Sequence, residues 1–570
     1  MKTALQKTIA RCFGFGLTAL MLVFTLACLD RPMKNAQPEP NYFIDIDLPQ
    51  SLERDVDLLF VIDDSGSMLD EQILLQAQFS ALMQKLRAME GGLPNVHLGV
   101  TSTDLGTSPF PITFCEQAGG DGGRLLTGSC VNPTGAPYVV DVEPQACEIS
   151  KDELGICSAH GCQEANCAHE PSTSLAIDAA TGCPRCRNYQ GQDLEDVFSC
   201  IAGLGTQGCG FEQPLEAMYK ALDSASTANS GFVRENAFLA VVFITDEDDC
   251  SASNPQLYDN SQTDINSQLG PLTSFRCFEF GIQCDQTGRT LQGLRTNCQP
   301  REDAGALLHP VSRYVNFLQQ MKDPQMLVVA AIAGPVTNQQ VTVGLDEYSQ
   351  PEVAFSCSTE RGGAVPGVRL RALVDAFNQP EDLSWAFSSI CSATYTDALQ
   401  GVADKIIGGL APQCPPTPFK GCSDPGAQFG LPADGYAGND QCLPTCRLQD
   451  VFQRGTAEES RADLPPCLEV CPQGSCQGNQ DPALAYASGH PAKRDSSLPV
   501  EACWHINYQE RCVSSNFGEI QVSRRADPPP RSFTDMVCVL VPQTELLCTD
   551  GRDNDEDGLT DWDDPDCASP

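Results

Sequence analysis

Apolar residues gather into three nearly unbroken runs, at 56–62, 238–244 and 326–333. Continuous rather than alternating apolar character predicts strands that are buried on both faces of a sheet. A helix is predicted after the first run, because apolar residues recur there at helical spacing: Leu75, Phe79, Leu82, Met83 and Leu86. We therefore expect residues 51–410 to form an α/β domain, a doubly wound and mostly parallel sheet with helices on both faces.

A polar turn ends the first apolar run. It carries an acid and two hydroxyls at alternate positions, Asp63, Ser65 and Ser67. Open α/β sheets bind ligands at the carboxyl ends of their strands, so this turn is a candidate site. Carboxylate and hydroxyl oxygens are hard donors that suit Mg²⁺, Mn²⁺ or Ca²⁺ rather than zinc. An ordinary Asp/Ser turn without a ligand is the alternative.

The pattern Asp63-x-Ser65-x-Ser67 after a buried strand resembles the metal-ion-dependent adhesion site of von Willebrand factor type A domains. The family adds a threonine and a second aspartate from later loops. The resemblance implies that these are Thr206, in a glycine-rich loop before a predicted helix, and Asp246, after the run 238–244. It also implies a Mg²⁺, Mn²⁺ or Ca²⁺ ion whose coordination is completed by an Asp or Glu of a protein partner. A helix-capping or turn role is the alternative for Thr206.

Charge excludes one class of partner. The chain has 570 residues, enough for roughly three to four domains of about 150 residues each. Its 75 acids against 35 basic residues give a formal net charge of −40. Nucleic-acid binding needs cationic side chains that neutralise phosphates, so this balance argues against it. The same balance favours attraction of divalent cations.

The first 27 residues have the pattern of an export signal, a basic stretch followed by an apolar segment too short for a membrane span. The segment ends in TLAC, which resembles a bacterial lipobox and implies lipidation of Cys28 and attachment to the outer membrane. Ordinary secretion is the alternative. Residues 28–50, rich in Pro, Asn and Gln, are expected to form a tether. No later segment is apolar and long enough to cross a bilayer.

The chain's 30 cysteines indicate an oxidising compartment. Many of them fall at about 106–195, where periodicity disappears, and we expect a disulfide-stapled insertion there. A zinc site in this insertion is the alternative, but the ligand spacing is loose. Cys200 and Cys209 are candidates to close the loop that carries Thr206. Cys357 and Cys391 flank a predicted helix and form a second candidate pair.

The C-terminal part of the chain has a different composition. Residues 411–547, rich in Cys, Pro and Gly, predict a small disulfide-rich module. The tail 548–567 contains DxDxDGxxD, which resembles EF-hand-like calcium loops and thrombospondin type 3 repeats. By that resemblance the Ca²⁺ ligands are the spaced aspartates Asp553, Asp555, Asp557 and Asp561, with Asp564 as a further candidate. Cys548 and Cys567 bracket the loop. A disordered acidic tail is the alternative.

These features predict an exported, lipid-anchored cell-envelope protein that binds a protein partner through a divalent cation. We do not expect an enzyme, since HExxH, GxSxG and P-loop motifs are absent and the six histidines show no metal or triad spacing. A metal-assisted hydrolase using Asp63 is the enzymatic alternative. A calcium-stiffened structural surface protein with a silent A-type domain is the other alternative.

Overall fold

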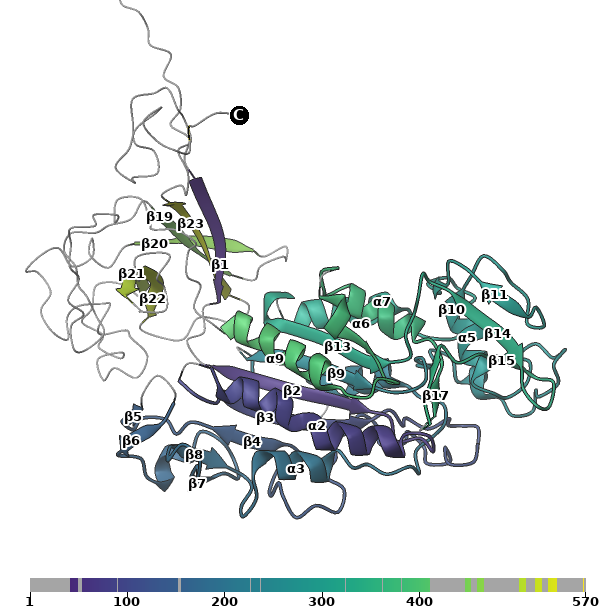
Figure 1. Ribbon diagram of the computed structural model, residues 1–570, viewed down its shortest axis with the longest axis horizontal. Helices are drawn as coiled ribbons and strands as arrows, with labels where there is room; N and C mark the ends of the chain where they lie inside the picture. Colours follow the sequence, from purple (N-terminus) through teal and green to yellow (C-terminus); the bar gives the residue numbers. More distant parts are fainter. Residues whose placement is uncertain are drawn as a thin grey trace, which may run out of the picture.

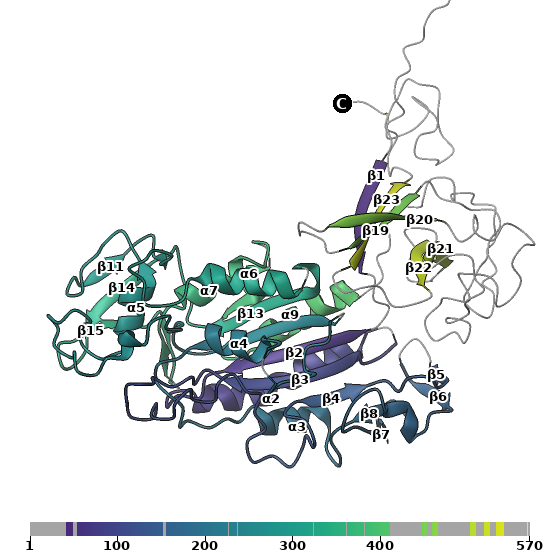
Figure 2. The same cartoon turned by 180° about the vertical axis from the view of Figure 1, so that it is seen from behind.

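The computed structural model describes residues 42–49, residues 54–410 with gaps at 90, 152–154, 226, 236, 323, 361 and 381, the segments 446–452, 459–465, 502–508, 518–524 and 532–540, and Cys567. A large α/β body makes up most of this part of the chain, and a smaller group of strands lies at one end of it (Figures 1 and 2). Within these residues no helix combines the length and the apolar character needed to cross a membrane.

Several predictions concern positions outside the described residues. They include the signal peptide, the lipidation site Cys28 and one bracketing cysteine, Cys548. They also include all five candidate calcium ligands: Asp553, Asp555, Asp557, Asp561 and Asp564. Cys567 is described, and it is buried and disulfide-bonded.

A sheet of eight strands forms the centre of the body, in the order β18-β13-β9-β2-β3-β4-β8-β7. From β18 to β3 neighbouring strands are parallel, and from β3 to β7 they are antiparallel. The strand bounds are β2 Asp55–Ile62, β3 Asn95–Ser102, β4 Val139–Val142, β7 Ser174–Ile177, β8 Pro184–Arg187, β9 Phe238–Ile244, β13 Leu327–Ala333 and β18 Phe387–Ser389. The three apolar runs of the sequence form β2, β9 and β13, and every residue of these strands is buried, as predicted.

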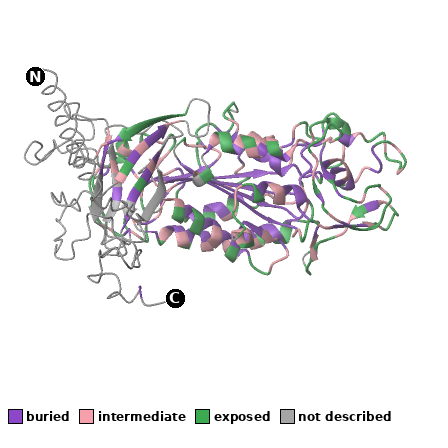
Figure 3. Cartoon of the chain, turned by 90° about the horizontal axis from the view of Figure 1, so that it is seen from above, coloured by how far each residue is buried: buried purple, intermediate pink, exposed green. Residues whose placement is uncertain are grey.

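Helices cover both faces of this sheet, as Figure 3 shows with the strands seen edge-on. One face packs against α2 (Leu69–Arg87), α3 (Leu194–Ile201) and α9 (Thr396–Leu410). The other packs against α4 (Pro214–Leu222), α6 (Val311–Met321), α7 (Val368–Asp375) and α8 (Leu383–Ala386). Alternate residues of β2 serve the two cores: Phe60 packs near Phe79 and Phe198, whereas Leu59 and Val61 belong to the opposite core. The large central sheet is therefore mixed but mostly parallel, with two buried faces.

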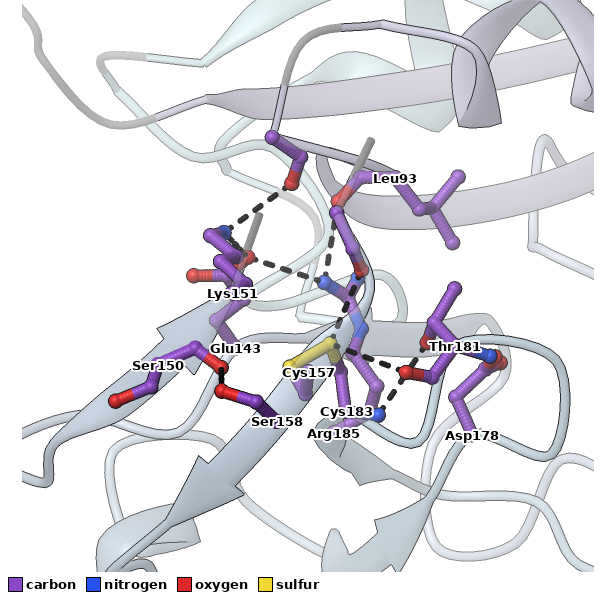
Figure 4. Close-up of a disulfide and its surroundings, with 12 residues drawn as sticks. Leu93, Glu143, Ser150, Lys151, Cys157, Ser158, Asp178, Thr181, Cys183 and Arg185 are labelled. Atoms are coloured by element: carbon purple, nitrogen blue, oxygen red, sulfur yellow. Dashed lines mark hydrogen bonds and ion pairs between the residues drawn. A yellow bond between two sulfur atoms is a disulfide. The ribbon is translucent and has the colours of Figure 1, made fainter. Parts of the chain in front are cut away.

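The predicted insertion at about 106–195 contributes strands to the central sheet. β4, β8 and β7 extend the sheet beyond β3, and β5 (Ile149–Lys151) pairs with β6 (Cys157–His160) beside them. Disulfides staple the segment, and the cysteines of the alternative zinc site are used in the pairs Cys147–Cys162, Cys157–Cys183 and Cys167–Cys186. Figure 4 shows Cys157–Cys183 beside Arg185, whose guanidinium donates to the carbonyl oxygen of Leu93 at 3.2 Å. The insertion is thus bonded to the sheet edge.

One predicted disulfide is wrong. Cys200 bonds to Cys130, and Cys209 bonds to Cys115, with Cα–Cα distances of 6.0 and 4.6 Å. The tertiary fold brings loops from the insertion against both cysteines, so neither closes the short loop between them. The pair Cys357–Cys391 is confirmed, with a Cα–Cα distance of 6.1 Å.

A smaller lobe follows β9. It contains α5 (Phe275–Gly281) and a three-stranded sheet in the order β11-β14-β15. The remaining bounds are β10 Ile282–Gln283, β11 Gly293–Arg295, β12 Gln299–Pro300, β14 Val341–Leu345, β15 Pro351–Val353, β16 Cys357–Ser358 and β17 Gly363–Ala364. The disulfides Cys250–Cys277 and Cys284–Cys298 tie its segments together.

A second sheet joins the two ends of the chain. Its order is β1-β23-β19-β20, with β1 at Tyr42–Pro49, β19 at Cys446–Phe452, β20 at Ser460–Leu464 and β23 at Ser532–Leu540. A hairpin of β21 (Ala502–Tyr508) and β22 (Gly518–Arg524) lies nearby. β1 falls within the range predicted as a tether, 28–50, and that prediction missed the strand because its hydrogen-bonding partner is β23, from the far end of the chain.

Candidate metal centre

The carboxyl ends of β2 and β9 lie side by side where the strand order changes direction. From β2 the chain passes to β3 on one side, and from β9 it passes to β13 on the other. The backbone N–H of Asp63 donates to the carbonyl oxygen of Ile244 at 2.9 Å, which joins the two strand ends. Loops that leave adjacent parallel strands in opposite directions form the crevice in which open α/β sheets bind ligands.

Asp63, at the end of β2, is held in one orientation. Its side chain is 0% exposed. The backbone N–H of Ser65 donates to its Oδ1 at 2.8 Å, and the hydroxyl of Thr245 donates to its Oδ2 at 2.7 Å. Because both oxygens are fixed by donors from two different strand ends, the carboxylate is preorganised before any ligand binds.

Three of the other predicted ligands lie with Asp63. The hydroxyls of Ser65 and Ser67 are 3.2 Å apart, and Ser67 lies close enough to the carboxyl group of Asp246 to lower its pKa. Asp246 is 8% exposed, whereas Ser67 is exposed to solvent. The site therefore has a buried floor formed by Asp63 and a solvent-facing mouth at Ser67.

Thr206 lies on a loop that packs against the same turn. The side-chain amide of Gln72 donates to the carbonyl oxygens of Asp63 and Gly205, at 2.8 and 2.9 Å. The backbone N–H of Gly208 donates to the carbonyl oxygen of Asp64 at 2.8 Å. The half-buried Thr206 thus stands between two anchored positions, but in the part of the chain that is described its hydroxyl makes no hydrogen bond to the other four predicted ligands.

Sequence reasoning missed Glu212, which precedes α4. Its side chain is 1% exposed, and its carboxyl group lies within hydrogen-bonding range of that of Asp63. The hydroxyl of Thr103, at the end of β3, donates to its Oε2 at 2.7 Å. The available signal was weak: an acid just before Pro214 reads as an ordinary acidic helix start.

Burial and mutual repulsion raise the pKa values of the acids around Asp63. Burial raises the pKa of Asp63, and burial with the nearby Asp63 charge raises the pKa of Asp246 to about 7. The same two causes raise the pKa of Asp64 to about 8 and that of Glu212 well above its ordinary value. Desolvation and the charge of Asp246 raise the pKa of Glu247 to about 8. Without a cation, burial and mutual repulsion therefore favour the protonated forms of these acids.

The donor set fits a hard cation. Asp64 Oδ1, Glu212 Oε1 and Asp246 Oδ1 are buried acceptors that no donor satisfies within the described residues. Such acceptors are costly unless a proton or cation approaches them. The donors are carboxylate and hydroxyl oxygens, which suit Mg²⁺, Mn²⁺ or Ca²⁺. In the described residues no three His, Cys, Asp or Glu side chains already surround one metal position.

The segment 246–249 after β9, here called the acidic turn, contains two further acids that have other partners. Asp249 pairs with the guanidinium of Arg369 at 3.0 Å, and both side chains are fully buried. Asp248 accepts the backbone N–H of Arg369 at 3.0 Å. These two carboxylates secure the start of α7 to the acidic turn.

A cavity of about 240 Å³ adjoins the acidic turn on the side of the smaller lobe. Its lining combines the acids at 247–249 with three aromatic side chains, Phe275, Phe278 and Phe355. The candidate site therefore adjoins a concave surface that is partly acidic and partly aromatic.

Comparisons with known proteins give little further information. No family model and no curated protein sequence matches the chain. A solved structure that aligns with it is the pilus adhesin SpaC from Lactobacillus rhamnosus GG in its open conformation, at 11% sequence identity and a TM-score of 0.27. The alignment covers 90% of this chain and 42% of the adhesin, so the chain spans less than half of that protein's length. A likeness at this level establishes neither a common fold nor a common function.

Proposed function

We propose that this chain is an exported binding protein whose α/β body holds a divalent cation at the turn after β2. Asp63, Ser65, Ser67 and Asp246 supply oxygen donors to the ion, and Thr206 lies on the loop beside them. The ion's open position faces solvent near Ser67 and takes an Asp or Glu carboxylate from a protein partner. The resemblance to the adhesion site of von Willebrand factor type A domains supports this assignment.

One observation carries the proposal. Side chains from two loops far apart in sequence, Asp63 with its serines and Asp246, converge at the point where the strand order reverses. This is the position at which such sheets place ligands. Asp246 Oδ1 is buried there without a donor in the described residues, and a cation would satisfy it.

The setting of the protein is proposed from its cysteines and its two ends. The many disulfides fit an oxidising compartment outside the cytoplasm. Lipidation of Cys28 would anchor the chain to the outer membrane, and the tail around Asp553–Asp564 would bind Ca²⁺. We propose no catalytic activity and no nucleic-acid partner.

The test is a calorimetric titration of the full chain with Mg²⁺, Mn²⁺ and Ca²⁺, comparing the natural protein with Asp63→Ala. Loss of an outer-shell partner alone costs about 10- to 100-fold in metal affinity, so loss of Asp63 should cost at least that. Asp404→Ala is the control, because Asp404 is an exposed acid paired with Lys85 on the surface. An aspartate-containing tripeptide should bind the natural protein only when metal is present.

Metal affinity at the α/β body that is the same in Asp63→Ala and in the natural protein would show that the site is not there. Metal binding without any metal-dependent capture of the tripeptide would leave the structural alternative, a cation that stabilises the body and recruits no partner.

A further inference from the structure

Two buried carboxyl groups face each other at the floor of the candidate site. Asp63 is 0% exposed and Glu212 is 1% exposed, and their side chains are in hydrogen-bonding range. Both oxygens of Asp63 and the Oε2 of Glu212 already have donors. Glu212 Oε1 is the exception, since no donor reaches it within the described residues. The pair therefore contains one buried acceptor, Glu212 Oε1, that a cation or a shared proton would satisfy.

The surroundings favour a cation. The charged groups that act most strongly on Glu212 are Asp63, Glu247 and Asp64, all of them acids. A shared proton would neutralise only one of these charges, whereas a divalent ion neutralises two and also satisfies the empty acceptor. Thr103 donates to the Oε2 of Glu212, and the Oε1 of Glu212 is buried without a donor in the described residues.

Given the cation site proposed above, we propose that Glu212, rather than Thr206, is the ligand contributed by the loop before α4. Glu212 shares the ion with Asp63. Its carboxylate makes the site select Ca²⁺ over Mg²⁺. Glu212 approaches Asp63 directly, whereas no hydrogen bond in the described structure joins the Thr206 hydroxyl to the site.

The ion preference follows from burial and charge. Mg²⁺ gives up its waters reluctantly and is usually held by one or two carboxylates with several waters retained. Ca²⁺ accepts six to eight protein oxygens with flexible geometry. Asp63 and Glu212 form a fully buried floor, and Asp246 adds a third carboxylate. These three groups leave little room for water around the ion, so the larger and more easily dehydrated cation is favoured.

The experiment compares Glu212→Gln, Glu212→Asp and Thr206→Val in the full chain. The parent for this comparison is the full chain with Asp555→Asn and Asp557→Asn, so that the predicted C-terminal calcium loop does not contribute to the signal. Every variant is made in this parent. Ca²⁺ and Mg²⁺ affinities are measured by calorimetry, and the Tm is measured in chelator. Glu195→Gln is the matched control, because Glu195 is a half-buried acid paired with Arg87 at the far end of α2.

We expect Glu212→Gln to weaken Ca²⁺ binding by at least about tenfold and to lower the ratio of Ca²⁺ to Mg²⁺ affinity. The amide keeps an acceptor for Thr103 and adds a donor toward Asp63, so the Tm in chelator should stay the same or rise. Glu212→Asp keeps the charge and should retain part of the affinity. Thr206→Val and Glu195→Gln should bind Ca²⁺ as the parent does.

Unchanged Ca²⁺ affinity in Glu212→Gln and Glu212→Asp overturns the inference, and so does a fall in affinity matched by a fall in the Tm in chelator. If Glu212→Gln does not fold, Glu212→Asp decides. A parent that binds Mg²⁺ more tightly than Ca²⁺ overturns the selectivity. If Asp63→Ala abolishes metal binding while both Glu212 variants keep it, only this inference fails. If Asp63→Ala also keeps it, the proposed function fails with it.

Discussion

Replacing Asp246 by asparagine should change how the stability of the metal-free protein depends on pH. Burial and the charge of Asp63 raise the pKa of Asp246 from 3.8 to about 7 in the folded chain. Between these two pH values the folded state holds a proton that the unfolded state has released. The free energy of unfolding therefore falls as the pH rises from about 4 to about 7.

The size of the effect follows from the pKa shift. Each pKa unit corresponds to about 1.4 kcal/mol, so ionisation of Asp246 removes at most about 4 kcal/mol of stability across this window. Asparagine has the same shape and does not ionise, so Asp246→Asn should not show this loss. At pH 7.5 the variant should be more stable in chelator than the natural protein, and near pH 4 the two should be similar.

The assay is urea unfolding in chelator at pH 4.5 and 7.5, followed by hydrogen-exchange mass spectrometry of the β2 and β9 peptides. These peptides report on the central sheet separately from the second sheet. Asp404→Asn, a surface acid paired with Lys85, should behave as the natural protein does. Equal losses of stability with rising pH in the natural protein and in Asp246→Asn would refute the reasoning.

Two further predictions test the frame around the site. Arg369→Leu leaves the fully buried Asp249 without its ion-pair partner and should cost about 3–5 kcal/mol in the free energy of unfolding, measured by urea unfolding; a cost below 1 kcal/mol would mean that the pair is dispensable. The double variant Cys115→Ser/Cys209→Ser removes a bridge between positions 94 residues apart, which the chain-entropy model values at about 4–5 kcal/mol. It also frees one end of the loop that leads to Glu212. Ca²⁺ affinity measured by calorimetry should therefore fall together with the Tm. Unchanged affinity would show that the bridge does not position the loop.

Local pattern was enough for the strands that build the sheet and for the turn at its edge. Continuous apolar runs predicted β2, β9 and β13, because a strand with helices on both faces must be apolar on both sides. The spacing of Asp63, Ser65 and Ser67 identified the turn, since hydrogen bonds within a tight turn join near neighbours. Asp246 came from the resemblance to the adhesion site, which implies a second aspartate after a later strand.

Features that depend on distant partners could not be read from local pattern. The pairing of Cys200 with Cys130 and of Cys209 with Cys115 depends on which loops fold together, because a disulfide requires proximity in space and is indifferent to separation in sequence. β1 is a strand because β23 supplies its hydrogen bonds from the other end of the chain.

The same distinction holds at the candidate site. Asp63, Ser65 and Ser67 lie on one short turn, so their spacing in the sequence is enough to identify them as candidate ligands. Glu212 looks like any acid near a helix start until the fold buries it against Asp63. Proximity of like charges is a property of the folded chain, so tertiary packing decided how many buried acids gather around Asp63.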